Sequence, residues 1–160
     1  MNEKKDGKTF IVFSSDLDKV LAAFNLAVGS ASMGFPVTMY FTFWGLSVLR
    51  KENHQPVKKS IIDHCIGFML PKGESGLVFS KMNYFGMGTW MMKILMRKRN
   101  LTMLPELMKV AKEMNVNIIA CDMAMKMMGI KKEELIDGIT FGGVAAYLKI
   151  SQEADLNLFI

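Results

Sequence analysis

The chain has 160 residues, 51% of them hydrophobic and 22% charged, with a formal net charge of +5 at pH 7. This length and this apolar share predict one folded domain over residues 8–160, after a flexible N-terminus over residues 1–7. The modest charge and the lack of a nucleic-acid-binding motif argue against nucleic acid as a partner. No apolar run approaches the roughly eighteen residues that a membrane span needs.

The chain carries two cysteines, Cys65 and Cys121, and no hydrophobic signal at its N-terminus. These features favour a reducing, cytoplasmic setting over a secreted one. The two cysteines and the two histidines lack the spacing of a structural zinc site. We therefore predict no metal and no cofactor.

The N-terminal part predicts a strand–helix–strand unit. Residues 8–14 form a short apolar run that indicates a buried strand. Residues 15–34 carry apolar side chains at helical spacing, with a capping box that starts at Ser15 and a helix-ending glycine at Gly34. Residues 37–44 form a second strand that is apolar nearly throughout, as in a parallel sheet covered on both faces.

The middle of the chain is less regular. Residues 45–52 predict a short helix, followed by a polar loop around residues 53–56. The segment 61–76 is ambiguous and ends in turn signals. Residues 79–98 have a helical pattern that two glycines interrupt, so we expect the firm helix to begin at about Thr89.

The last third alternates regularly between helices and strands, which predicts a doubly wound α/β domain of about five strands. The side chains expected on the inward face of its first helix are Leu104, Leu107, Met108, Ala111 and Met114. The expected elements are a helix over 104–115, a strand over 116–121, a short helix over 122–129, a helical turn over 130–138, a strand over 139–141, a helix over 142–154 and a strand over 156–160.

Cys121 ends a predicted strand and stands immediately before a predicted helix. In an open α/β sheet, ligands bind beyond the carboxyl ends of the strands, and the N–H groups at a helix N-terminus lower the pKa of a thiol. Asp122 would oppose this effect or cap the helix. Position alone leaves two interpretations equally open: a reactive thiolate, or a buried structural cysteine.

Other residues are expected at the same edge of the sheet. Two serines end the first strand, two aromatic residues end the second, and two glycines open the last helix, where backbone N–H groups can hold an anion. The alternatives are a helix cap for Ser15 and close packing for the glycines. We predict that a crevice beside Cys121 is lined by Ser14, Ser15, Phe43, Trp44, Asp122, Gly142 and Gly143.

The chain has 16 methionines, which gather in two clusters over residues 82–96 and 123–128. Methionine is flexible and polarizable, so these clusters suit an adaptable core or a subunit interface. Copper(I) binding is the weaker interpretation, because the methionines alternate with bulky apolar residues. Residues 91–99 combine apolar bulk with basic charge, which leaves a membrane-surface patch as a minor alternative.

Three blocks, PKGESGLVFSKMNYFGMGTWMMK, VNIIACDMAMKMMGIKKEELIDGITFGGVAAYL and the terminal LNLFI, resemble the DsrE/DsrF-like family of sulfur-relay proteins. The resemblance spans the chain from Lys8 onward. It implies a flavodoxin-like three-layer α/β sandwich around a mostly parallel sheet of roughly five strands. It also implies a homo-oligomer, often a trimer or a hexamer.

The residue that matches the sulfur-carrying motif of the family is Cys121, and the resemblance implies that it accepts sulfane sulfur as a persulfide. The predicted function is therefore a sulfurtransferase or sulfur carrier, which takes sulfur from a donor protein and passes it to the thiol of an acceptor protein. Cys65 lies outside the motif and has no implied role. The alternative is a non-catalytic oligomeric scaffold or binding protein with an inert Cys121.

Overall fold

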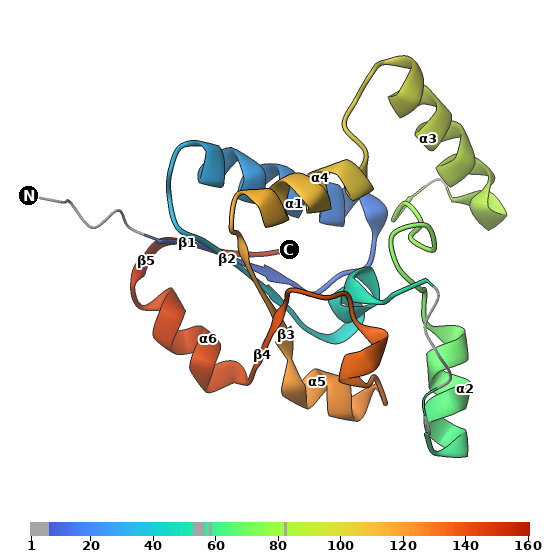
Figure 1. Ribbon diagram of the computed structural model, residues 1–160. Coiled ribbons are helices and arrows are strands. Elements are labelled where there is room, and N and C mark those ends of the chain that lie inside the picture. The colour runs from blue at the N-terminus through green and yellow to red at the C-terminus, as the bar shows by residue number, and fades with distance from the viewer. Residues whose placement is uncertain (1–6, 53–56, 58, 82) are drawn as a thin grey trace, which may run out of the picture.

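The computed structural model describes residues 7–52, 57, 59–81 and 83–160, and it contains a five-stranded sheet in which every strand pair is parallel. The strand order is β4-β3-β2-β1-β5 (Figure 1). The α/β class and the parallel five-stranded sheet confirm the sequence prediction. The strands are β1 (Gly7–Val12), β2 (Val37–Phe41), β3 (Asn117–Cys121), β4 (Thr140–Gly142) and β5 (Ala154–Phe159).

Helices cover both faces of this sheet. On one face α1 (Leu17–Ser32) and α4 (Leu104–Glu113) lie side by side, and on the other face lie α5 (Asp122–Met127) and α6 (Val144–Ser151) (Figure 1). This arrangement is the three-layer sandwich that the sequence predicts. Because both faces are covered, the central strands have no solvent side, and all five residues of β2 are buried.

The strand–helix–strand unit is present at the N-terminus with shifted boundaries. Gly7 already lies in β1, so the prediction of a flexible segment reaching residue 7 is wrong at that residue. Residues 1–6, the remainder of that prediction, lie outside the described residues. Gly34 follows the end of α1 with a φ of 80°, which confirms its predicted role as the helix-ending glycine.

The capping box predicted at Ser15 is wrong. Asp16 is the N-cap residue of α1, and no side chain donates or accepts a capping hydrogen bond there. The Asp18 carboxylate, which the capping box would have used, accepts hydrogen bonds from the Ser80 N–H at 3.0 Å and the Ser80 hydroxyl at 2.6 Å. A long-range contact has therefore taken the place of the local one.

The turn after β2 approaches β1 so closely that only glycine fits. A Cβ atom at Gly45 would lie 2.1 Å from the carbonyl oxygen of Val12. The Gly45 N–H also donates to the Phe13 carbonyl at 2.8 Å. The helix expected over residues 45–52 is a 3-10 helix that begins earlier, η1 (Phe43–Leu49).

The remainder of the middle third resolves into two helices. The ambiguous segment contains α2 (Ile61–Met69). The helix expected from Thr89 begins two residues earlier, as α3 (Met87–Lys98), after the short 3-10 turn η2 (Tyr84–Gly86). The polar loop expected around residues 53–56 lies outside the described residues.

The last third follows the predicted order with shorter elements. The helical turn before β4 is η3 (Lys132–Glu134). Gly142 is the last residue of β4, so the helix expected to begin there begins instead at Val144. Met114, expected on the inward face of α4, is exposed at the end of that helix, which corrects the prediction.

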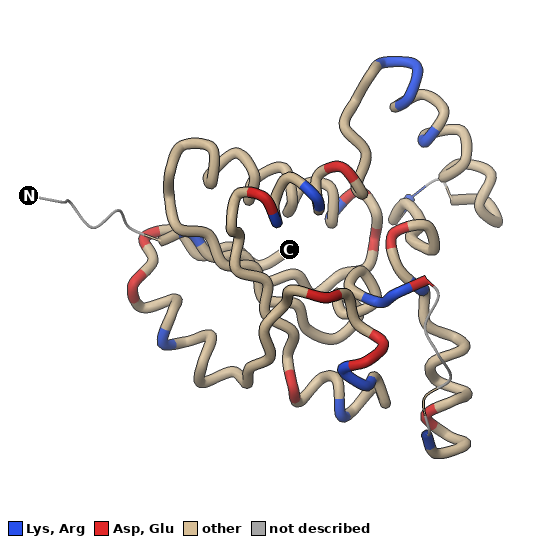
Figure 2. Tube along the Cα trace, in the orientation of Figure 1, with Lys and Arg blue, Asp and Glu red and all other residues tan. Residues whose placement is uncertain are grey.

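Helices α2 and α3 project beyond the three layers (Figure 1). Both helices carry exposed apolar side chains. Figure 2 shows basic residues near the end of α3, where Arg97 and Lys98 occupy its last turn. No helix among the described residues has both the length and the apolarity needed to cross a membrane. We call the exposed surface the apolar flank; it consists of Ile61, Ile62, Phe68, Met69, Met87, Trp90, Met91 and Leu95.

Candidate functional site

Cys121 is the last residue of β3 and also the N-cap residue of α5. Its Sγ accepts a hydrogen bond from the Ala124 N–H at 3.5 Å, which satisfies one of the free donors of the first helical turn. The side chain is fully buried. The predicted position of Cys121 between a strand and a helix is confirmed, and the alternative in which Asp122 caps the helix is wrong.

Two hydroxyl-bearing residues, one in β2 and one directly after it, share a face of the sheet with Cys121. β2 and β3 are parallel neighbours with Tyr40 opposite Ile119, and residues two apart on a strand point to the same side. Tyr40 and Thr42 therefore lie on the face that carries the Cys121 side chain. All three residues are buried, so the sulfur and the two hydroxyls share an environment closed to solvent.

The hydrogen-bond donors around the sulfur decide its ionisation. Burial by itself raises the pKa of the Cys121 thiol, because the thiolate loses its hydration. The Ala124 N–H, which is hydrogen-bonded to the sulfur, and the nearby Tyr40 hydroxyl, Thr42 hydroxyl and Met123 N–H together outweigh burial and hold the pKa of Cys121 below its ordinary value. The site therefore raises the share of the thiolate, which is the nucleophilic form.

Tyr40 is held in place by a stacked neighbour on α6. Its ring lies 4.9 Å from that of Tyr147, with 29° between the planes. The Tyr147 hydroxyl is hydrogen-bonded to the Thr9 hydroxyl at 3.1 Å, and Thr9 donates to Oδ1 of Asn157 at 2.5 Å. The Tyr40 hydroxyl is buried and makes no hydrogen bond of regular geometry with the described residues. Burial and the adjacent Cys121 sulfur raise the pKa of Tyr40, so its phenol keeps its proton.

Three of the predicted crevice residues adjoin Cys121 in sequence or in the sheet. Gly142 pairs with Cys121 across β3 and β4, and a Cβ there would lie 3.3 Å from that of Ala146, so the glycine lets α6 pack closely. Gly143 is the N-cap residue of α6, with open space where a side chain would be. Asp122 is half-buried and lines a cavity of about 250 Å³ beside α5.

The remaining four residues of the predicted crevice follow β1 and β2 at the same edge of the sheet: Ser14, Ser15, Phe43 and Trp44. None of the hydrogen bonds between described residues joins them to Cys121. Ser14 Oγ accepts the Asp16 N–H at 3.0 Å, and the Phe43 ring packs against that of Phe13 at 5.2 Å. Trp44 is 51% exposed. The donors next to the sulfur are thus Tyr40 and Thr42, not the predicted serines.

The other sulfur-bearing residues are divided between core and surface. Both cysteines are free thiols, and Cys65 is exposed on α2. In the second methionine cluster Met125 and Met128 are buried, whereas Met123 and Met127 are exposed. Within the described part of the chain, no group of three or more His, Cys, Asp and Glu residues is placed to hold a metal ion.

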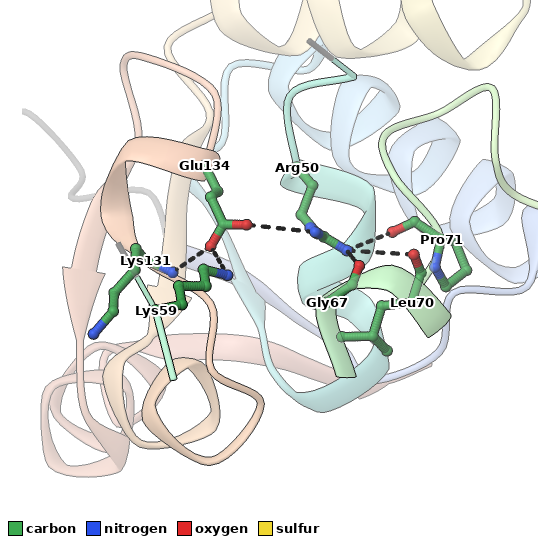
Figure 3. Close-up of polar contacts among 7 residues, drawn as sticks. All are labelled: Arg50, Lys59, Gly67, Leu70, Pro71, Lys131 and Glu134. Carbon is green, nitrogen blue, oxygen red and sulfur yellow. Dashed lines mark hydrogen bonds and ion pairs between the residues drawn. The ribbon is translucent and has the colours of Figure 1, made fainter. Parts of the chain in front are cut away.

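A second buried polar cluster lies away from Cys121 and centres on Glu134 (Figure 3). Its carboxylate contacts the Arg50 guanidinium at 3.4 Å and also pairs with the Lys59 ammonium. The Lys131 N–H donates to the same carboxylate at 2.8 Å. The side chains of Arg50, Lys59 and Glu134 are almost completely buried, so their charges depend on one another for stabilisation.

Arg50 also fixes the end of α2 (Figure 3). Its Nη1 donates to the carbonyl oxygens of Gly67, Leu70 and Pro71 at 3.1, 3.3 and 3.3 Å. These carbonyls lie at the C-terminal end of α2, where helical partners are missing. The cluster therefore fastens a projecting helix to the body of the domain.

The sequence prediction did not include Tyr40, Thr42, Arg50 or Glu134. A signal for the first two exists, because hydroxyl residues recur at every second position along β2 and just beyond it, at Thr38, Tyr40 and Thr42, between apolar residues. Period-two alternation places such residues on one face of a strand. The sequence holds no comparable signal for the ion pair, since its partners come from segments that are far apart.

Comparison with known proteins gives a consistent result over the whole chain. The model of the DsrE/DsrF/DrsH-like family matches residues 5–159. Over 160 residues and the full length of both chains, the protein is 43% identical to "Uncharacterized protein YrkE" of Bacillus subtilis (strain 168). Over 166 residues and the full length of both chains, it is 32% identical to "Sulfur carrier protein DsrE2" of Allochromatium vinosum.

A solved structure has the same fold. The crystal structure of the ychN protein from E. coli aligns with a TM-score of 0.56 over 96% of this chain and 99% of that chain. The two sequences are 12% identical, so this likeness concerns the fold alone.

Proposed function

The chain belongs to the DsrE/DsrF/DrsH-like family, and from this premise we propose that it is a sulfur carrier or sulfurtransferase that holds sulfane sulfur as a persulfide on Cys121. It takes this sulfur from a donor protein and passes it to the thiol of an acceptor protein. The relative named a sulfur carrier protein supports a role in sulfur relay. The role is assigned to Cys121 because the hydrogen-bond donors near its sulfur lower the pKa of the thiol.

The two transfer steps are thiol exchanges without net oxidation or reduction. In loading, the Cys121 thiolate attacks the outer sulfur of the donor persulfide; a new S–S bond forms, the old one breaks, and the donor leaves as a thiolate. In discharge, an acceptor thiolate attacks the outer sulfur on Cys121, and Cys121 leaves as the thiolate. A lowered pKa raises the thiolate fraction for the first step and improves the leaving group for the second.

Access to the sulfur requires movement, because Cys121 is fully buried. The elements that cover it, α5 and α6, are short and carry exposed apolar residues on their outer surface. We expect donor and acceptor proteins to contact this surface and to admit the incoming sulfur when α5 or α6 shifts. The exposed residues are Met123, Met127, Val144 and Leu148.

Persulfide loading tests the proposal. Because Cys65 is exposed and would itself react, Cys65→Ser serves as the reference protein, and the variant lacking both cysteines serves as the blank. After exposure to polysulfide and removal of excess reagent, the intact mass of Cys65→Ser should rise by whole sulfur atoms and return to its starting value on reduction. If Cys65→Ser takes up no more sulfur than the blank, Cys121 is not a carrier.

The burial of Cys121 supports one second candidate function, a non-catalytic oligomeric scaffold with an inert thiol. In that case Cys65→Ser would remain unmodified by polysulfide while folded, and would react only after unfolding. The same experiment in the presence and absence of urea therefore distinguishes the two functions.

Copper(I) binding by the methionine clusters is tested by metal analysis after exposure to Cu(I). Labile, substoichiometric copper would argue against such binding.

We also propose that the protein forms homo-oligomers, as the family resemblance implies, and that the apolar flank contributes to their interface. So much exposed apolar surface on two helices is uncommon in a monomer. Light scattering should give a mass of several chains, as in a trimer or a hexamer, and Trp90→Glu should lower it while Arg99→Glu does not. A monomer whose flank binds anionic lipid vesicles would instead favour the membrane-surface alternative.

The two free thiols fit the reducing cytoplasm, where we place the relay.

A further inference from the structure

Tyr40 and Tyr147 form a stacked pair in which the two hydroxyls have different surroundings. The Tyr147 hydroxyl is satisfied by Thr9. The Tyr40 hydroxyl is buried and makes no hydrogen bond of regular geometry within the described part of the chain. Buried hydroxyls are rarely left without a partner, so an unsatisfied one calls for a functional explanation.

The sheet register places Tyr40 on the same face of the sheet as Cys121, on the neighbouring strand. Tyr40 stands opposite Ile119, two residues before Cys121, on the strand next to β3. The stack with Tyr147 limits rotation of its ring. A neutral thiol is a weak hydrogen-bond acceptor and a thiolate is a strong one. A hydroxyl that is poorly paired beside the thiol would therefore gain its partner when the sulfur becomes charged.

We propose that Tyr40 is the hydrogen-bond donor that stabilises the Cys121 sulfur as a thiolate and thereby speeds discharge of the persulfide. This role rests on the proposed function of Cys121 and adds a second residue to the site. At discharge, the S–S bond to Cys121 breaks and its electron pair goes to Cys121 Sγ. The Tyr40 O–H donates a hydrogen bond to that developing charge and keeps its proton, so no further reactant is needed.

The same hydrogen bond affects the two transfer steps unequally. In discharge it lowers the basicity of the leaving sulfur, which accelerates the step. In loading it raises the thiolate fraction but lowers the nucleophilicity of each thiolate, so the two effects partly cancel. Tyr40→Phe should therefore slow the transfer of sulfur to a small acceptor thiol more than it slows uptake from polysulfide. The carboxylate of Asp122 also raises the pKa of Tyr40, and it is unchanged in the variant.

The direct test is the ultraviolet absorbance of the thiolate as a function of pH, in the Cys65→Ser background. Tyr40→Phe keeps the ring and its stack but removes the hydroxyl. Tyr147→Phe is the matched control, because it removes the other hydroxyl of the same stack. We expect the thiolate-to-thiol ratio of Cys121 at a given pH to fall about tenfold in Tyr40→Phe, the effect of losing one hydrogen bond to a charged group. Tyr147→Phe should leave the ratio unchanged.

The titration uses no sulfur donor, so it tests Tyr40 separately from the relay. An unchanged titration in Tyr40→Phe, or an equal shift in Tyr147→Phe, would overturn the role of Tyr40 even if Cys121 carries sulfur. Conversely, a shifted titration in a protein that never loads sulfur would sink the carrier function and the discharge role together, leaving only the effect on ionisation. If Tyr40→Phe is unstable, 3-fluorotyrosine at position 40, a stronger donor, should move the titration to lower pH.

Discussion

Arg50 and Glu134 form an ion pair at 3.4 Å in which each side chain is only 1% exposed. Removing one member of a buried pair leaves an unpaired charge in a medium that solvates it poorly. Here the loss of Glu134 would leave two such charges, because Lys59 also pairs with that carboxylate. Since Arg50 also binds the carbonyls at the end of α2, we infer that the placement of α2 depends on this pair.

Glu134→Ala should destabilise the fold by about 3–5 kcal/mol, the range found when a buried ion pair loses one partner. Urea unfolding followed by circular dichroism measures this change. Glu113→Ala is the matched control, since its pair with Lys109 is exposed and should contribute less than about 1 kcal/mol. Equal effects of the two substitutions would contradict the structural role assigned to Glu134.

The stability that Glu134 provides should also depend on pH. Burial would raise the pKa of Glu134, but the Lys131 N–H, Lys59 and Arg50 outweigh burial and hold it below its ordinary value. A carboxyl group whose pKa is lower in the folded state contributes its full stability above the unfolded pKa, and loses it as the pH falls through the folded pKa.

We therefore expect the stability gap between wild type and Glu134→Gln to be constant above about pH 5 and to narrow as the pH falls below about 4. Urea midpoints measured at a series of pH values give the gap directly. A gap that widens toward acid pH would mean that burial dominates, and that the carboxyl group is easier to protonate in the folded protein than in the unfolded chain.

Two glycines should respond in opposite ways to alanine. Gly45→Ala would place a Cβ 2.1 Å from the Val12 carbonyl oxygen, so we expect a loss of about 3 kcal/mol or more. Gly29 lies within α1, and a Cβ atom added there would meet open space. Gly29→Ala should stabilise the protein by about 0.5–1 kcal/mol, because alanine favours the helix. Thermal unfolding of both variants measures the two changes in stability. If both variants became more stable, or both less stable, one of the two expectations would be wrong.

Alkylation of the native protein should show whether solvent access or ionisation controls the reaction rates of the two cysteines. Cys65 is exposed and Cys121 is buried, so iodoacetamide should label Cys65 about tenfold faster or more, because Cys121 reacts only through open conformations. If thiolate fraction controlled the rates, Cys121 with its lowered pKa would react first. Peptide mass spectrometry gives both rates in one sample, and labelling in urea should make them similar.

The sheet could be predicted from sequence because its signals are local. Each buried strand is a short apolar run, and the sequence places a helix between successive strands of the outer thirds. The position of Cys121 between a strand and a helix is local in the same sense. These features depend on residues a few positions apart, and the structure confirms them.

The features that escaped prediction depend on distant contacts. The Arg50–Glu134 pair joins segments that are separated in the sequence by the helices α2, α3, α4 and α5 and by the strand β3. The cap expected at Ser15 was lost because Ser80 binds the Asp18 carboxylate that would have completed it. The hydroxyls near the sulfur come from Tyr40 in β2 and from Thr42 directly after it, and β2 pairs with β3 only in the folded sheet. Sequence spacing can place these hydroxyls on one face of a strand, but it does not show which residues they meet.

Because Cys121 caps α5 with its own sulfur, the atom assigned to sulfur transfer also anchors a helix. Cys121→Ser keeps a side-chain acceptor at the N-cap, whereas Cys121→Ala removes it. Both variants abolish the thiol equally. The difference between their unfolding midpoints therefore measures how much the N-cap acceptor stabilises the fold. The sulfur uptake that both variants lose measures the contribution of the thiol to transfer.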